Sequence, residues 1–296
     1  MSLGLYRHDD DNDLTVLRRQ AVAAVAAGFA GVTLAEHHNA RSGYVAHPQA
    51  FTAALLPVLG SGWVAAAPTI LNLRPPRAVA EDLIWTNAMH PGRVGLAVGA
   101  GFDREDFDLY GVPFDGRLGA FRRLLAELAR TRIDHPPFGT GAIADLPVIV
   151  ATRGARNVEA AAHAGFGLLL PPLPAATARE LSDRFRASGG RGPVVLGRWA
   201  FLGEPPIAAV AALNGAIAAT EGDLSWRDAD SVITVDSAGA PGQLATQLAD
   251  HVIASGADHL HLRIHLPGLA PAVVDEQIAA VGAMVVPEVQ ARLAAR

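Results

Sequence analysis

Residues 31–38, GVTLAEHH, join an apolar strand pattern to three ionisable side chains. Val, Thr and Leu favour a pleated strand, whereas Glu36, His37 and His38 contribute little to a buried one. Helix-like amphipathic runs lie on both sides, at 14–28 and 47–59. A short strand between two helices is typical of a parallel sheet, whose functional groups gather at the carboxyl ends of its strands.

The same alternation continues through all 296 residues, about the length that a (β/α)8 barrel requires. We expect strands at 3–6, 31–36, 62–67, 94–98, 146–151, 167–170, 194–201 and 258–264. We expect helices at 14–28, 47–59, 76–90, 115–131, 154–164, 175–188, 205–219, 241–255 and 271–294. The sequence therefore predicts an α/β fold, a single-domain (β/α)8 TIM barrel over residues 1–296, with an insertion at about 220–240 before the last strand. A doubly wound sheet with a small second domain is the competing fold.

Composition excludes several classes of function. The formal charge is −5 and no basic run exists, so nucleic acid and anionic membranes are poor partners. Cysteine and lysine are both absent, which excludes thiolate nucleophiles and Schiff-base chemistry. No signal-peptide pattern opens the chain and no apolar run approaches about 18 residues, so we expect a soluble cytoplasmic protein.

Two further motifs have bland alternatives. Gly99-Ala-Gly101 lacks the third glycine of a dinucleotide fingerprint, and acids follow it in Phe102-Asp-Arg-Glu-Asp106. In the last expected strand, period-two geometry puts His259, His261, Arg263 and His265 on one face, pointing into the barrel or its mouth. A metal site would need further ligands, so we predict no metal and expect inward polar residues that bond to one another or to a ligand.

Thr152-Arg-Gly-Ala-Arg156 follows the fifth expected strand and opens a helix. A hydroxyl, a glycine and two arginines at a helix N-terminus can cradle a phosphate, because free N–H groups and the helix dipole face the anion there. An ordinary capped helix start with exposed arginines is the alternative.

Several short pieces, in this order, resemble the bacterial luciferase-like flavin-dependent monooxygenases over nearly the whole chain. They are Ala35-Glu-His-His38, Pro76-Arg-Ala-Val-Ala-Glu-Asp82, His90-Pro-Gly-Arg93, Gly99-Ala-Gly-Phe102, Tyr110-Gly-Val-Pro-Phe114, Arg117, Gly256-Ala-Asp-His-Leu260, Leu266-Pro-Gly268 and Val285-Val-Pro287.

The resemblance implies a (β/α)8 barrel that binds reduced FMN, or in some branches a deazaflavin coenzyme. It implies a monooxygenase that inserts one atom of O2 into a small organic substrate, aldehyde-like or similar. His37 matches a histidine beside the reacting flavin edge, and with His38 it is the candidate catalytic group, because imidazoles exchange protons near neutral pH. A deazaflavin-dependent oxidoreductase is the second interpretation, and a degenerate, non-catalytic barrel is the third.

The resemblance also implies cofactor contacts. The family's cis peptide beside the flavin maps to Ala67 and Pro68, and Arg117 matches a phosphate-binding arginine. Ala100 stands where luciferases carry another such arginine, and the connection at 132–145 is shorter than usual. These two departures favour weak cofactor binding or an inactive member. We expect Arg117, Thr152, Arg153, Gly154 and Arg156 to hold the FMN phosphate.

The expected partners follow from the same resemblance. A separate reductase would deliver reduced FMN, and the chain would form a homodimer through the helix at 76–88. The apolar residues Val79, Leu83 and Ile84 of that helix are expected to form the interface.

Overall fold

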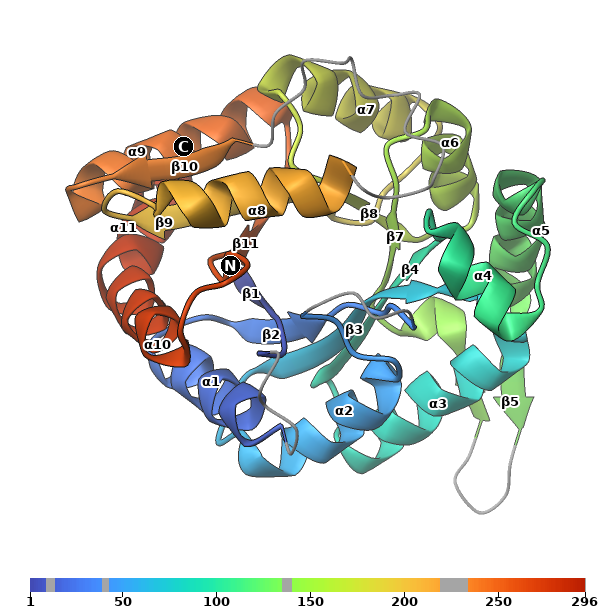
Figure 1. The fold of residues 1–296 in the computed structure, drawn as a ribbon. Helices are drawn as coiled ribbons and strands as arrows, with labels where there is room; N and C mark the ends of the chain where they lie inside the picture. Colours follow the sequence, from blue (N-terminus) through green and yellow to red (C-terminus); the bar gives the residue numbers. More distant parts are fainter. Residues whose placement is uncertain (9–13, 39–42, 135–139, 219–233, 296) are drawn as a thin grey trace.

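The computed structural model describes residues 1–8, 14–38, 43–134, 140–218 and 234–295. Eight parallel strands close into a ring, and helices surround it (Figure 1). The ring runs in the order β1-β2-β3-β4-β7-β8-β9-β11 and closes between β11 and β1. Its strands are β1 (Ser2–Leu5), β2 (Gly31–Leu34), β3 (Trp63–Ile70), β4 (Val94–Gly99), β7 (Val148–Ala151), β8 (Gly167–Leu170), β9 (Val194–Leu202) and β11 (His259–Arg263).

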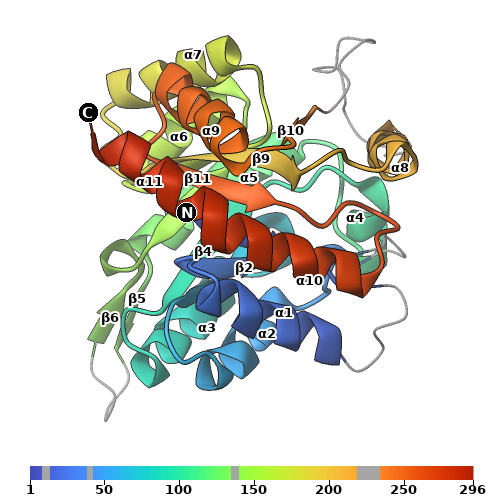
Figure 2. The same ribbon diagram turned by 90° about the vertical axis from the view of Figure 1, so that its left-hand side faces the viewer.

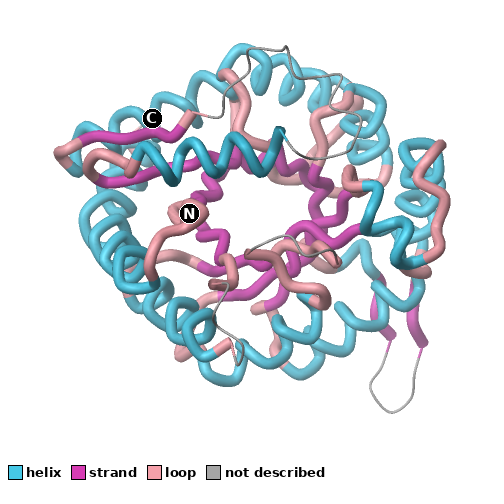
Figure 3. Tube along the Cα trace, in the orientation of Figure 1, coloured by secondary structure: helices cyan, strands magenta, loops and turns pink. Residues whose placement is uncertain are grey.

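Most of the helices surround the ring of strands, and α8 (Ile207–Ala218) lies across its mouth (Figure 1 and Figure 3). The other helices are α1 (Thr15–Ala26), α2 (Pro48–Leu55), α3 (Pro76–Met89), α4 (Arg104–Tyr110), α5 (Arg117–Arg130), α6 (Ala155–His163), α7 (Ala175–Ala187), α9 (Pro241–Ser255), α10 (Pro271–Ala280) and α11 (Val286–Ala294). A π-helical turn, Val281–Val285, joins the last two. The described residues contain no helix that is long and apolar enough to cross a membrane.

The two faces of the sheet carry different side chains. The outward face packs against the helices in the main core, which includes Leu3, Val32 and Leu262. A separate small cluster of buried alanines, Ala65, Ala67 and Ala97, lies with Leu169. Strand pleating alternates the faces, so these small residues point into the ring. Trp63, Ile149 and Val195 pack against this cluster.

Gly31 allows close packing between β2 and β3 at the start of both strands. A Cβ on Gly31 would lie 2.2 Å from the ring of Trp63, its register partner on β3. Only glycine leaves space for the Trp63 indole against β2, so a larger residue at position 31 would displace that ring.

The predicted barrel is confirmed, and all eight expected strands are present within two or three residues of their predicted ends. Four elements were not predicted: helix α4, the antiparallel strands β5 (Arg132–Asp134) and β6 (Thr140–Ala142), and strand β10 (Val235–Ala238). The predicted insertion at 220–240 lies mostly outside the described residues. Its end forms β10, which pairs with β9 at Trp199–Leu202 outside the ring.

Two further expectations concern β3 and α3. The predicted cis peptide between Ala67 and Pro68 is confirmed. The predicted dimer interface on α3 was wrong. Val79 and Leu83 are buried in the chain's own core, and Ile84 is half-buried against it. That face is therefore occupied within one chain.

Candidate active site

His37 and Asp106 meet at the carboxyl end of the barrel. Nδ1 of His37 lies 2.5 Å from Oδ2 of Asp106, and the His38 backbone N–H donates to Oδ1 at 2.7 Å. Both side chains are almost fully buried. An ionised carboxylate only accepts hydrogen bonds, so Nδ1 of His37 is the donor in this pair and Nε2 faces away from Asp106.

Helix α4 carries Asp106 to this position. Gly101 turns the chain after β4 with φ +75°, and a Cβ there would lie 2.8 Å from both Ile70 and the Phe107 ring. Phe107 is fully buried and anchors the helix. The Asp103 side chain caps the helix by accepting from the Glu105 N–H at 3.3 Å.

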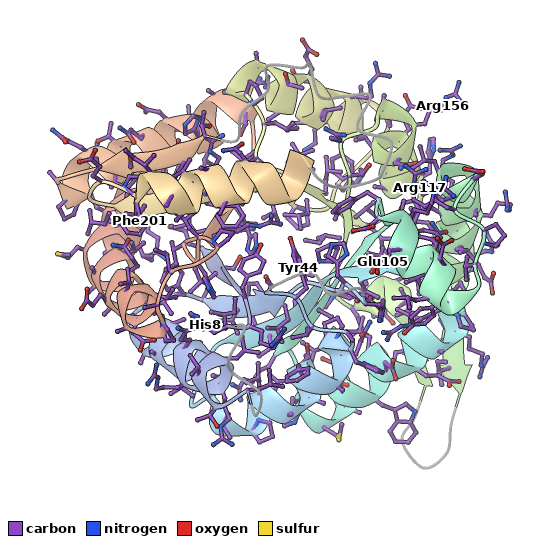
Figure 4. The ribbon with its side chains drawn as sticks, viewed as in Figure 1. His8, Tyr44, Glu105, Arg117, Arg156 and Phe201 are labelled. Carbon is purple, nitrogen blue, oxygen red and sulfur yellow. The ribbon has the colours of Figure 1, made fainter. Side chains whose placement is uncertain are left out.

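Aromatic rings surround His37. Residues 43–45 return alongside the end of β2, where Val45 bridges to Glu36. Tyr44 meets the His37 ring edge-on at 4.4 Å between centroids, and Phe102 meets it at 5.1 Å. Tyr44 points toward the centre of the ring in Figure 4. These rings orient the imidazole and reduce its contact with water.

Glu36 joins the end of β2 to the end of β3 and the turn after it through hydrogen bonds. Its Oε1 accepts from Arg74 Nη2 at 2.8 Å, and its Oε2 accepts from the Ile70 N–H at 2.8 Å. His38 Nε2 lies 2.6 Å from the same Oε1, and Tyr110 OH lies 3.3 Å from His38 Nδ1. Both nitrogens of His38 are therefore engaged, which suits a positioning residue more than a proton-transfer group.

The ends of β3, β4 and β7 form a floor of small residues beside the site. A Cβ on Gly99 would lie 3.6 Å from both the Pro68 side chain and the Ala151 carbonyl. Pro68, Ala100 and Ala151 are half-buried, and the Glu36 N–H donates to the Pro68 carbonyl at 3.0 Å. The predicted residues Ala67, Pro68 and Ala100 thus lie in the strand ends next to the one that carries His37.

Arg117 is fixed beside that floor. Its Nε donates to the Gly101 carbonyl at 3.3 Å, and its guanidinium lies 3.9 Å from the Phe114 ring centre. Asn72 Nδ2 donates to the carbonyls of both Ala100 and Arg117, at 2.7 and 3.1 Å. Asn72 Oδ1 is buried and has no hydrogen-bond partner among the described residues.

The other predicted phosphate ligands lie at the end of β7. Thr152 and Arg153 are half-buried, and Thr152 Oγ1 accepts from the Gly154 N–H at 3.2 Å. Helix α6 begins there without a side-chain cap. Strand β7 adjoins β4, so this helix start neighbours Ala100. Arg156 is exposed and lies at the outer edge of the molecule in Figure 4, away from Arg117.

The two histidines on the polar face of β11 differ in exposure. His259 is exposed at its start. His261 is buried inside the ring between Ser2 Oγ at 3.0 Å and Thr33 Oγ1 at 3.5 Å. Burial, together with the charge of Arg263, lowers the pKa of His261 to about 3, so its imidazole is neutral.

One group of residues has metal-ligand character. His37, Asp103 and Asp106 are all buried, and their ligand atoms lie within 4.8 Å of one another. Asp106 already accepts two hydrogen bonds, from the His37 ring and the His38 N–H. The geometry is that of a carboxylate orienting an imidazole.

Sequence reasoning missed Asp106, Tyr44 and Arg74. Asp106 was seen only as an acid that argues against a dinucleotide site. The available signal was Asp103 followed by two acids, the pattern of a capped helix start. Tyr44 and Arg74 carry no local signal, because only the tertiary fold brings them to His37 and Glu36.

Comparison with known proteins agrees with this geometry. A family model described as luciferase-like monooxygenase matches residues 3–259, and the chain therefore belongs to that family. The uncharacterized protein y4vJ of Sinorhizobium fredii (strain NBRC 101917 / NGR234) is 27% identical over 106 residues, which make up 36% of this chain and only 30% of that protein.

Two solved structures share the fold at low identity. An F420-dependent secondary alcohol dehydrogenase in complex with an F420-acetone adduct matches with a TM-score of 0.75 and 16% identity, covering 97% of this chain and 98% of that one. The oxygenating constituent of 3,6-diketocamphane monooxygenase from Pseudomonas putida, in complex with FMN, matches with a TM-score of 0.74 and 15% identity, covering 98% of both. At 15–16% identity, these two structures show that this chain shares their fold.

Proposed function

We propose that this chain is a flavin-dependent monooxygenase that uses reduced FMN and O2 on a small organic substrate. The observation that carries the proposal is the His37–Asp106 pair, buried at the barrel mouth beside the half-buried Pro68 and Ala151 and the buried Gly99. The FMN-bound structural relative supports the choice of cofactor.

The residues present fit FMN in two respects. The side chains at the ends of β3, β4 and β7 are small, which suits the close approach of a flat ring system. Arg117, Thr152, Arg153 and the uncapped start of α6 offer donors to a phosphate dianion. When bound, reduced FMN supplies the electrons that activate O2.

His37 would act as the proton carrier of the site. Asp106 fixes the Nδ1 proton, so Nε2 can take a proton from the reacting centre and return it. Tyr44 and Phe102 limit access of water to that nitrogen. In this proposal His38 ties the end of β2 to α4 through Glu36 and Tyr110.

The F420-bound relative favours a second candidate, hydride transfer with a deazaflavin. Ala100 supports it, because the chain lacks one cation that luciferases place on the FMN phosphate. The two functions differ in their use of O2.

Isotopically labelled O2 separates them. The protein, supplied with reduced FMN by a separate flavin reductase and with a panel of small aldehydes and ketones, is expected to transfer one labelled oxygen atom into a product. Turnover with reduced F420 that consumes no O2 and leaves the product unlabelled would select the hydride-transfer function instead.

A homodimer remains part of the proposal. Met89, at the end of α3, is 60% exposed, and Val58, in the 3-10 turn after α2, is 42% exposed. These residues, instead of the buried Val79 and Leu83, would form the contact.

A further inference from the structure

Arg263 is a cation inside the barrel whose charge has no carboxylate partner among the described residues. It lies on β11 in register with Gly4 on one side and Trp199 on the other. Its Nε is buried without a hydrogen-bond partner, and its guanidinium carbon lies 5.6 Å from the centre of the Trp199 ring.

Among the described residues, the neighbours of Arg263 make room for its side chain and carry no negative charge that would balance its own. A Cβ on Gly4 would lie 3.0 Å from His261 Nε2 and 3.4 Å from Arg263 Cγ, so glycine lets both side chains enter the ring. Tyr6 is buried, and its burial raises its pKa further than the Arg263 charge lowers it. His261 is neutral. Neither group supplies a negative charge near neutral pH.

A partly buried cation without a counter-ion is costly to keep, because desolvation is not repaid by an ion pair. Arginine stays protonated at every accessible pH and so cannot relieve the cost by losing its proton. Its fork of donors suits planar bidentate acceptors such as carboxylates. A bound ligand with a negatively charged group would supply the counter-ion that Arg263 lacks among the described residues.

We infer that Arg263 binds the anionic group of a small organic acid, with Trp199 and Tyr6 packing on the apolar part of the same molecule. The Tyr6 and Trp199 rings stack on one another at 5.8 Å between centroids, which places two aromatic side chains beside Arg263 for that part to contact. The inference deepens the proposed function, on which it rests, by assigning the substrate class.

The position of Arg263 separates this anion from the cofactor phosphate. The proposed phosphate donors lie at the ends of β4 and β7, whereas β9, β11 and β1 form the other side of the ring (Figure 1). A reduced flavin ring that carries a negative charge is the alternative source of the anion, and the experiment has an arm for it.

The test uses benzoate and benzamide, which share shape and differ in charge, as probes of the flavin-free protein by calorimetry. Wild type is expected to bind benzoate at least ~10-fold more tightly than benzamide. Arg263→Met should remove the preference and Arg263→Lys should keep part of it. Arg191→Met, at an exposed position, is the matched control and should bind like wild type.

Equal affinity for the two probes, binding of neither, or a preference that survives in Arg263→Met would overturn the inference. A second result would also overturn it: wild type shows no preference for benzoate, and Arg263→Met binds reduced FMN more weakly than wild type does. Arg263 would then bind the flavin instead of an organic acid. Because the probe titrations contain no flavin, their failure leaves the FMN proposal standing, and a failure of FMN to bind leaves the benzoate result intact. Loss of folding in Arg263→Met is judged by its melting temperature, and the wild-type probe comparison decides without any variant.

Discussion

At the scale of single residues, the hydrogen bond between His37 and Asp106 determines what the site can do. It fixes the tautomer of a buried imidazole and leaves one nitrogen for chemistry. The resemblance to luciferase-like monooxygenases identified His37, at the end of a strand, as the candidate reacting group. It did not predict Asp106, which lies 69 residues further along the chain.

Removing the imidazole should reduce turnover far more than stability. We expect His37→Ala and Asp106→Asn each to lower oxygenation by ~100-fold or more, as for a lost or misdirected acid–base group. The melting temperature of His37→Ala should stay within a few degrees of wild type. His163→Ala, at an exposed position on α6, is the control. Normal turnover in His37→Ala, or its unfolding, would contradict the catalytic role.

His261 should make folding stability sensitive to acid. Its pKa is about 3 in the folded protein and near 6.5 when unfolded, so between these values the unfolded chain binds the extra proton. Stability is therefore lost as pH falls below 6.5. From this residue we expect a loss of about 2–3 kcal/mol between pH 7 and pH 4.5.

Urea unfolding at the two pH values measures this effect. His261→Gln, which does not titrate there, should lose correspondingly less stability on acidification than wild type. An identical pH dependence in both proteins would show that the buried imidazole does not titrate as proposed.

At the scale of elements, regular amphipathic patterns were predictable and short tertiary additions were not. Strand β2 is a short, fully buried run, and helix α5 buries Phe121, Leu125 and Leu128 at helical spacing, so their positions followed from the sequence. Helix α4 spans only Arg104–Tyr110, and its apolar anchor Phe107 finds its partners in Ile70 and Phe114 through tertiary packing. Strand β10 has no fully buried residue, and only its pairing with β9 defines it.

The Glu36–Arg74 pair links the end of β2 to the turn after β3, and breaking it should be costly. The side chain of Glu36 is fully buried, so Arg74→Met leaves an uncompensated charge. We expect a loss of about 3 kcal/mol or more in the free energy of unfolding. Arg77→Met is the matched control, because the Arg77–Glu81 pair on α3 is exposed and should contribute at most about 0.5 kcal/mol.

Denaturant titration of both variants measures the difference. Similar stabilities for Arg74→Met and Arg77→Met would show that Glu36 is neutralised in another way.

At the scale of the whole molecule, the ring gathers residues from β2, β3, β4 and β7 at one end. Figure 2 shows α4 and α8 at that end and the β5–β6 pair at the other. The sequence predicted this arrangement because each strand end carried its own signal. It could not predict which face of α3 stays open, because amphipathicity alone does not distinguish packing within one chain from packing between two.

Sedimentation tests the proposed dimer. We expect a homodimer at micromolar concentration, with Met89→Glu shifting it toward monomer because a charge would be buried at the contact. Val22→Glu, at a 40% exposed position on α1, is the control and should leave the dimer intact. A clean wild-type monomer would contradict the expectation.

Calorimetric titration of the flavin-free protein with FMN and with riboflavin tests the flavin-binding role most directly, because the two ligands differ only in the phosphate. We expect FMN to bind more tightly, its affinity to fall as salt rises, and Arg117→Glu to erase the preference, while Arg156→Glu on the outer face of α6 keeps it. Equal affinity for FMN and riboflavin would contradict the phosphate site at Arg117. Binding of neither, or of a deazaflavin alone, would contradict an FMN-dependent monooxygenase.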